Sequence, residues 1–275
     1  MTTPTPAQNS GFDRRTLLRR GGLTLGLGAF LSACAADFGG DTAPGRVGLV
    51  ESETMLPEGT VNDVVYLRTM QSLEHSVVEL LSALIAGGHF TAAQQSYIDR
   101  FIADHVAASE ALGQHITEAG GEPYACENTW VRSRFIDPVL TAVASSDDAS
   151  RDARSSAHAF ETMLAHSYQH LVGIASAPAI RHGLMSLGAS AARRSALLAA
   201  QSSSSEFGYF GPEINGEAVE TDAEGFPIGY ALPAVFGQVG QIPLVVGAVD
   251  DEGARYSTSL QTPAENTFVY EYMSC

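Results

Sequence analysis

The sequence predicts a mainly α fold in which four long helices are followed by a small β-rich tail. Within residues 60–201, apolar residues recur at three- and four-residue spacing in four stretches, which is typical of helices with one buried face. Residues that begin or end helices separate these stretches. From residue 202 onward the composition shifts to Gly, Pro and β-forming residues, which indicates a different kind of structure.

The first helix is predicted over residues 61–87. We expect Thr60 to cap its start and Gly87-Gly88 to end it. Glu74 lies seven residues after one leucine of the apolar face and seven before another, so it points toward the core. Because a buried carboxylate without a partner costs roughly several kcal/mol, Glu74 is expected to face an ion, an arginine or water.

The second helix is predicted over residues 92–119 and begins with a capping box formed by Thr91 and Gln94. His105 falls on its apolar face, so we expect a second titratable group inside the fold. The connection that follows, residues 122–148, has the length of a crossover, and such a crossover joins parallel helices more readily than an antiparallel pair.

The third helix, residues 150–175, places Glu161 and Tyr168 beside its apolar face. The fourth helix, residues 178–201, carries Arg194 at the spacing of its buried residues. Two helices, a crossover and two further helices make up a four-helix bundle with one long crossover between helices two and three. The bundle is therefore assigned to residues 60–201.

The tail, residues 202–275, is predicted to contain a β-hairpin. Two β-forming segments, 244–249 and 255–260, flank an acidic turn that contains glycine. Residues 267–272 could add a third strand.

Residues 1–33 are interpreted as an export signal. Arg14 and Arg15 resemble the twin-arginine motif, and an apolar run too short to span a bilayer follows them. The run ends at Leu-Ser-Ala-Cys, which resembles the box that directs lipidation of a cysteine, here Cys34. We therefore expect a lipid anchor on the extracytoplasmic side of the cell membrane, with residues 34–59 as a tether.

The net charge and the cysteines limit which partners the chain is expected to have. The formal net charge of −16 argues against nucleic acid as a partner. Export would place Cys126 and Cys275 in a compartment that permits disulfides, so we expect them to pair, with free thiols as the alternative. The membrane is expected to be reached through lipidated Cys34 rather than through surface charge.

Several stretches resemble bacterial exported ferritin-like domains of unknown function. They are the stretch 72–78 in the first helix, 103–112 with Gly-Gly-Glu-Pro-Tyr at 120–124, Ala-Phe-Glu at 159–161 and 189–194. The resemblance covers residues 60–201 and implies a ferritin-like bundle. Metal-binding members of that superfamily use Glu from helices one and three and Glu-x-x-His from helices two and four.

The metal pattern of that superfamily is incomplete here. Glu74 and Glu161 match its first and third positions, but the second-helix pair falls near Val106 and Ser109, with His105 adjacent. The fourth-helix pair falls on Ala191 and Arg194, and the sequence contains no Glu-x-x-His. Because a guanidinium does not bind metal, the resemblance implies that the dinuclear iron site has been lost and that no cofactor is needed.

Three interpretations of these inward residues stay open. In the first, Arg194 neutralises Glu74 and Glu161 in a buried cluster, with His105 as a further member. In the second, Glu74, His105 and Glu161 form an atypical site for iron or manganese in an oxidoreductase or storage protein. In the third, the bundle carries a small ligand in a cavity lined by Met70, Tyr97 and Tyr168.

The first interpretation leads to a function without catalysis. The chain is then an envelope-anchored ferritin-like lipoprotein that serves as a structural module or binds a protein or small-molecule partner. His166 and His170 lie four residues apart and could share a metal ion, but they fall off the apolar stripe. We therefore interpret both as solvent-facing histidines.

Overall fold

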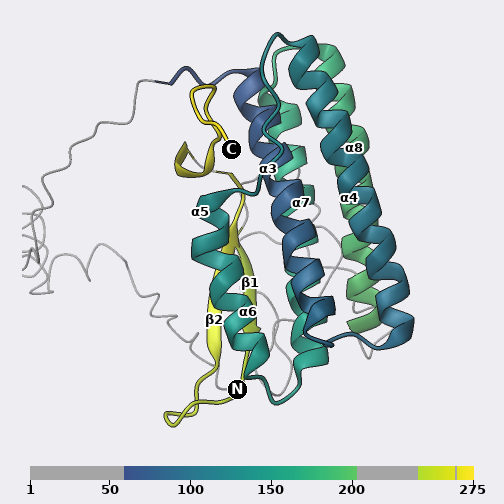
Figure 1. Ribbon diagram of the computed structural model, residues 1–275, viewed down its shortest axis with the longest axis vertical. Helices are drawn as coiled ribbons and strands as arrows, with labels where there is room; N and C mark the ends of the chain where they lie inside the picture. The colour runs from purple at the N-terminus through teal and green to yellow at the C-terminus, as the bar shows by residue number, and fades with distance from the viewer. Residues whose placement is uncertain (1–58, 203–240, 264) are drawn as a thin grey trace, which may run out of the picture. The chain divides into compact units, whose positions relative to one another are not determined.

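A computed structural model describes residues 59–202, 241–263 and 265–275 of the chain. These residues form a mainly helical structure with a two-stranded antiparallel sheet near the C-terminus, as predicted (Figure 1). The described residues belong to one compact unit. The expected export motif with Arg14 and Arg15, the expected lipidation site Cys34 and nearly all of the expected tether lie outside the described residues.

Four helices of 24 to 27 residues dominate the described part of the chain. They are α3 (Asp63–Ala86), α4 (Ala92–Glu118), α7 (Ala149–Ile174) and α8 (Pro178–Ser202). The two sequential pairs, α3 with α4 and α7 with α8, pack closely, and α3 also contacts α7. None of the helices described is both long enough and apolar enough to traverse a bilayer.

The residue that caps the start of α3 differs from the one expected. The Asn62 side chain, not Thr60, accepts the hydrogen bond from the Val65 amide and begins α3. The neighbouring Asp63 accepts hydrogen bonds from Ser176 and the Ala177 amide in the turn before α8. The polar residues at the start of α3 therefore fix that turn as well as the helix itself.

The capping box predicted for α4 is present, and its removal has a defined expected effect. Thr91 Oγ1 accepts from the Gln94 amide, and Gln94 Oε1 accepts from the Thr91 amide at 2.8 Å. Thr91→Ala is expected to lower the free energy of unfolding by about 1 kcal/mol, as measured by urea denaturation. Thr117→Ala is the matched control, because this exposed threonine of α4 caps nothing. Equal losses in the two variants would contradict a capping role for Thr91.

The connection between α4 and α7 is more ordered than the sequence suggested. It contains α5 (Thr129–Val131), a π-helical turn η1 (Arg132–Ile136) and α6 (Asp137–Ala144). These elements return along the length of the long helices, so that α4 and α7 run in the same direction (Figure 1). The connection therefore forms an additional layer on the long helices rather than an extended loop.

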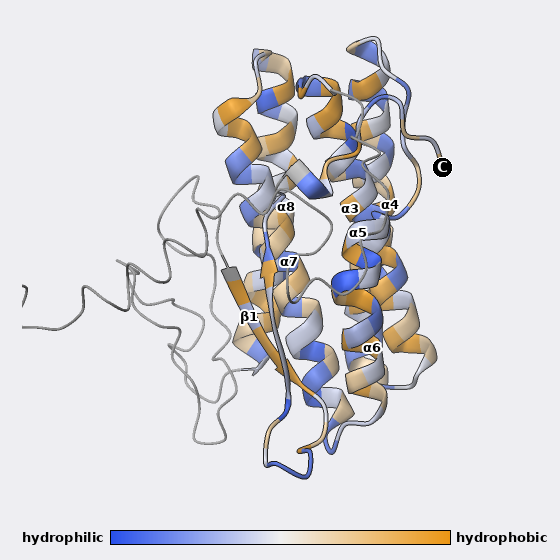
Figure 2. Cartoon of the chain, turned by 90° about the vertical axis from the view of Figure 1, so that its left-hand side faces the viewer, coloured by the Kyte–Doolittle hydropathy of each residue, from blue (hydrophilic) through white to orange (hydrophobic). Residues whose placement is uncertain are grey.

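The predicted hairpin is confirmed, but the third strand is not formed. Strand β1 (Gln241–Val246) pairs antiparallel with β2 (Tyr256–Gln261), in the register that sets Val246 opposite Tyr256. The candidate strand at residues 267–272 is instead irregular chain after the 3-10 turn η2 (Glu265–Thr267). The more hydrophobic strand, β1, packs against α7 (Figure 2), which leaves the apolar residues of the hairpin in the common core.

One buried carboxylate fixes the hairpin to the helices. Asp152, in the first turn of α7, is fully buried and accepts a hydrogen bond from the Gly247 amide at 2.7 Å. Ser146 and Arg151 also donate to its carboxylate. Asp152 thus connects the end of β1 to the start of α7.

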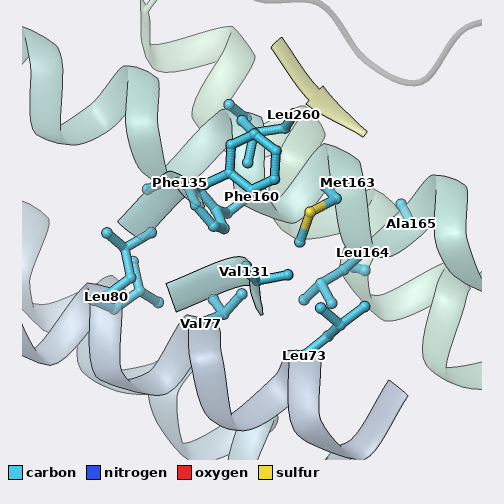
Figure 3. Packing of buried hydrophobic residues seen from close by; sticks show 14 of the residues in the cluster. Leu73, Val77, Leu80, Val131, Phe135, Phe160, Met163, Leu164, Ala165 and Leu260 are labelled. Atoms are coloured by element: carbon cyan, nitrogen blue, oxygen red, sulfur yellow. The ribbon is translucent and has the colours of Figure 1, made fainter. Parts of the chain in front are cut away.

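The hydrophobic core lies between the long helices, the connection and the hairpin. Leu73, Val77 and Leu80 of α3 face side chains from α7 and from the connection (Figure 3). The other labelled side chains in this layer are Val131, Phe135, Phe160, Met163, Leu164, Ala165 and Leu260. At roughly 1.5–3 kcal/mol for each fully buried large apolar side chain, this layer supplies most of the driving force for packing.

Candidate functional site

Each of the four long helices contributes one charged side chain to a single buried cluster. Glu74 comes from α3, His105 from α4, Glu161 from α7 and Arg194 from α8. Arg194 is 5% exposed and the other three are fully buried. Glu74, His105 and Arg194 sit where the apolar spacing of the sequence predicts a buried face, whereas Glu161 was expected beside that face and is buried as well. We call these four residues the buried charge cluster.

His105 occupies the centre of the buried charge cluster and bridges the two carboxylates. Its Nδ1 lies 2.5 Å from Glu74 Oε2, and its Nε2 lies 2.9 Å from Glu161 Oε1. A carboxylate only accepts hydrogen bonds, so both ring nitrogens must carry a proton to satisfy both contacts. The geometry therefore calls for the imidazolium form.

The electrostatics of the cluster favour the same protonation state. Burial lowers the pKa of His105, but attraction to Glu161 and Glu74 and the hydrogen bonds to both outweigh it and raise the pKa to about 9. For Glu161, burial raises the pKa, but the positive charges of His105 and Arg194 reverse this and hold it below its usual value. The two groups therefore stabilise each other's charged forms.

Arg194 completes the charge balance through Glu161. Its Nε donates to Glu161 Oε1 at 2.8 Å, so this oxygen accepts from both cations. Arg194 Nη2 also lies 3.4 Å from His105 Nδ1, a contact that is not a hydrogen bond when that nitrogen is protonated. Among the described residues, Glu161 Oε2 has no hydrogen-bond partner. Two carboxylates and two cations thus share one buried volume.

Tyr168 is a fifth member of the site, and the sequence pattern did not assign it this role. Its hydroxyl donates to Glu74 Oε1, the oxygen that His105 does not contact. Burial, together with the negative charge of Glu74, raises the pKa of Tyr168 well above its usual value, so the phenol keeps its proton. Tyr168 lies seven residues after Glu161 on the same face of α7, which is the spacing that could have revealed it.

The structure revises how the predicted residues pair. Glu74 faces a histidine and a tyrosine, whereas the hydrogen bonds of Arg194 go to Glu161 and not to Glu74. Of the positions that correspond to the second-helix ligand pair, Val106 is 45% exposed and Ser109 bonds to His75 Nε2 at 2.9 Å. The described residues contain no group of three or more His, Cys, Asp or Glu side chains that could hold a metal ion.

The interpretation of His166 as solvent-facing is wrong. His166 is only 8% exposed, and neither of its ring nitrogens has a hydrogen-bond partner among the described residues. Burial lowers its pKa to about 4. His170, one turn further along α7, is half-buried. The helix therefore buries a neutral imidazole at a position that the apolar spacing had assigned to the polar face.

The buried His166 is expected to make the fold sensitive to acid. The pKa of His166 is about 4 in the folded chain and about 6.5 in the unfolded chain. Between pH 4 and pH 6.5 the unfolded chain therefore binds more protons than the folded chain. As far as it depends on His166, the free energy of unfolding keeps its full value above pH 6.5 and falls by about 3 kcal/mol as the pH drops to 4. His166→Leu should therefore flatten this part of the pH–stability curve, measured by urea denaturation. His170→Leu is the control, and its pH–stability curve should have the slope of the wild type.

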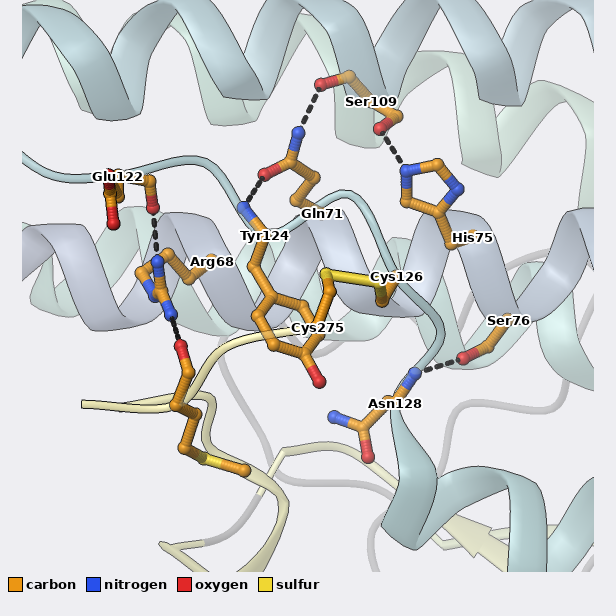
Figure 4. Close-up of a disulfide and its surroundings, with 11 residues drawn as sticks. Arg68, Gln71, His75, Ser76, Ser109, Glu122, Tyr124, Cys126, Asn128 and Cys275 are labelled. Atoms are coloured by element: carbon orange, nitrogen blue, oxygen red, sulfur yellow. Dashed lines mark hydrogen bonds between the residues drawn. A yellow bond between two sulfur atoms is a disulfide. The ribbon is translucent and has the colours of Figure 1, made fainter. Parts of the chain in front are cut away.

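The predicted disulfide is formed, and it lies beside a second polar region of the molecule. Cys126 of the connection and Cys275 have Cα atoms 5.8 Å apart (Figure 4). Near it, the Gln71 side chain of α3 donates to the Ser109 carbonyl and accepts from the Tyr124 amide. This polar region holds the connection and the last described residues on α3.

Comparisons of the chain with protein-family models, with curated proteins and with solved structures found no match.

Proposed function

We propose that this chain is an exported, envelope-anchored ferritin-like module in which the buried charge cluster takes the place of a dinuclear metal centre. Its role is structural or partner-binding rather than catalytic. The observation that carries the proposal is the position of His105 between Glu74 and Glu161, with Arg194 on the second carboxylate. The two cations balance the two carboxylates, so a metal ion is not required for that purpose.

The donor set does not fit a dinuclear metal centre. Both nitrogens of His105 are used by carboxylates, and a metal could bind the ring only after it lost a proton and one of these contacts. The Arg194 guanidinium holds the inner oxygen of Glu161 and cannot act as a ligand. A second ion would also need carboxylates that the described part of the chain does not bring to this place.

The ferritin-like architecture is supported by the order and direction of the helices. The pair α3 and α4 is followed by a connection that returns along the helices and then by the pair α7 and α8 (Figure 1). One long crossover between the second and third helices is the topology of ferritin-like bundles. The convergence of one polar side chain per helix at the centre also agrees with descent from a metal-binding bundle.

The proposed location follows from the sequence. The twin arginines Arg14 and Arg15 and the box ending at Cys34 support export followed by lipid attachment. Metabolic labelling with a radioactive or clickable fatty acid tests this directly, with Cys34→Ser as the matched control. The proposal requires that the label enter the wild-type chain and not the variant.

Metal analysis of the purified protein tests the proposed replacement of the metal centre. The protein is made without a histidine tag, incubated with Fe(II) or Mn(II) under anaerobic conditions, desalted and analysed by mass spectrometry. We expect less than about 0.1 metal ion per chain, since binding must displace a proton and a guanidinium contact. Stoichiometric iron or manganese that is lost in Glu74→Gln would overturn the proposal and favour an atypical metal-dependent oxidoreductase or storage protein.

A further inference from the structure

The last described residues of the chain lie along α3 and are held there mainly through their main chain. We call residues 265–275 the C-terminal strap. The Val269 amide donates to Thr69 Oγ1 of α3 at 2.9 Å. The Thr267 carbonyl accepts from Asn128 Nδ2 of the connection at 2.8 Å. The groove between α3 and the connection therefore binds the peptide backbone of the strap at two points.

A buried arginine provides the strongest of these contacts. Arg68 of α3 is 2% exposed, and its guanidinium donates to the carbonyls of Glu122, Tyr270 and Met273 (Figure 4). The same guanidinium lies over the ring of Tyr124, 5.3 Å from its centroid. Two of its three acceptors belong to the strap, so removal of the strap would leave this buried cation largely unsatisfied.

The strap is bound through its main chain and through a few of its side chains. Val269 is 2% exposed and Thr267 is 4% exposed, so these two side chains enter the groove. Phe268 is half-buried, and its ring packs edge-on against Tyr66 of α3, with 5.9 Å between the ring centroids. Tyr272 is 48% exposed. Recognition by main-chain contacts together with a few apolar side chains is the pattern by which proteins bind extended peptides.

The disulfide that fastens the strap is open to chemical attack. Cys275 is exposed and Cys126 is half-buried. A dithiol reductant can attack this bond through its thiolate and form a mixed disulfide, and its second thiol then resolves the intermediate. The products are two free cysteine thiols on the chain and one oxidised dithiol. The main-chain contacts, the buried side chains of Thr267 and Val269 and the contact of the Phe268 ring with α3 then hold the strap without a covalent bond.

We propose that the groove formed by Arg68, Thr69 and Asn128 is a peptide-binding site that the C-terminal strap occupies while the disulfide is intact. Reduction of Cys126–Cys275 releases the strap and opens the groove to an extended peptide with an apolar residue at the position of Val269. The chemistry of the site does not depend on the buried charge cluster, because none of the residues of the cluster contacts the strap or Arg68 in any hydrogen bond among the described residues.

Hydrogen exchange on the full chain tests the release. The Val269 amide is expected to exchange at least about tenfold faster after treatment with a dithiol, and equally fast in Cys275→Ser and in Cys126→Ser. The Val77 amide, in the middle of α3, is the internal control and should exchange at the same rate in both states. An unchanged Val269 amide in the reduced protein would show that the strap stays in place, and this result overturns the proposal.

Binding of a synthetic peptide tests the groove. A fluorescent peptide with the sequence of residues 266–274 is titrated up to about 1 mM, since a tethered strap competes at millimolar effective concentration. The reduced chain is expected to bind it at least tenfold more tightly than the oxidised chain. Substitution of Asp for the valine in the peptide should abolish binding, and so should Thr69→Val in the protein. Equal binding by the oxidised and reduced chains, or no binding by the reduced chain, contradicts the proposal.

Discussion

Replacement of His105 by alanine is expected to lower the free energy of unfolding by about 3–5 kcal/mol. The change removes the positive charge between Glu74 and Glu161 and leaves both carboxylates buried, with Tyr168 and Arg194 as their only partners. Guanidinium chloride denaturation at pH 7 measures the loss. His115→Ala on the same helix is the matched control, and it should cost less than about 1 kcal/mol because the ion pair of His115 with Glu118 is partly exposed to solvent.

The contribution of His105 should also depend on pH in a direction opposite to that of His166. The pKa of His105 is raised from 6.5 to about 9 in the folded chain, so the folded state binds more protons in this range. The resulting stability, about 3 kcal/mol, is complete below pH 6.5 and is lost as the pH rises through 9. The stability of the His105→Ala variant should not fall in this way as the pH rises from 6.5 to 9. A wild-type stability that is flat between pH 6.5 and 9 would contradict the imidazolium assignment.

Arg194→Ala is the second substitution with a large expected effect, about 3–5 kcal/mol in the free energy of unfolding. It leaves Glu161 with His105 as its only hydrogen-bond partner among the described residues, and both of these side chains are fully buried. Thermal and chemical denaturation both measure this loss. Arg193→Ala controls for the removal of a guanidinium, because this exposed neighbour donates only to Ser190. It should melt within about two degrees of the wild type.

A double-mutant cycle separates the ion pair from the packing of the long side chain. Glu161→Gln with Arg194→Met removes both charges and keeps the volumes similar. If the cost of Arg194→Met comes from the stranded carboxylate, the double variant should be less destabilised than the sum of the single variants by at least about 1 kcal/mol. Additive losses would assign the cost of the arginine change to packing alone.

The helices were predictable from the sequence because their apolar spacing is regular. The eight boundaries of the four long helices fall within two residues of those expected, and the inward positions of Glu74, His105 and Arg194 followed from the same spacing. Helical periodicity specifies which face of a helix is buried, and a charged residue on that face is conspicuous. Three of the four charged members of the site could thus be predicted from the helix pattern, whereas Glu161 was expected beside the buried face of its helix.

The pairing inside the site was not predictable, since periodicity does not fix the depth or rotation at which helices pack. One of the interpretations that the sequence left open paired Glu74 with Arg194, whereas the structure places His105 and Tyr168 on the two oxygens of Glu74. His166 was assigned to the polar face because helical spacing does not show which other segments of the chain cover a helix, yet its side chain is only 8% exposed. Whether such a helix position is buried depends on how segments far away in the sequence pack against the helix.

The distribution of the cluster over all four long helices has a consequence for how the chain folds. Each sequential helix pair holds one ion pair, Glu74 with His105 and Glu161 with Arg194, and the contact of His105 with Glu161 joins the two pairs. A partly folded state with only one pair assembled would lack this joining contact and the burial that the other pair provides for the charges. Such intermediates are therefore disfavoured, and the bundle should fold in a single cooperative transition, without a stable two-helix subunit.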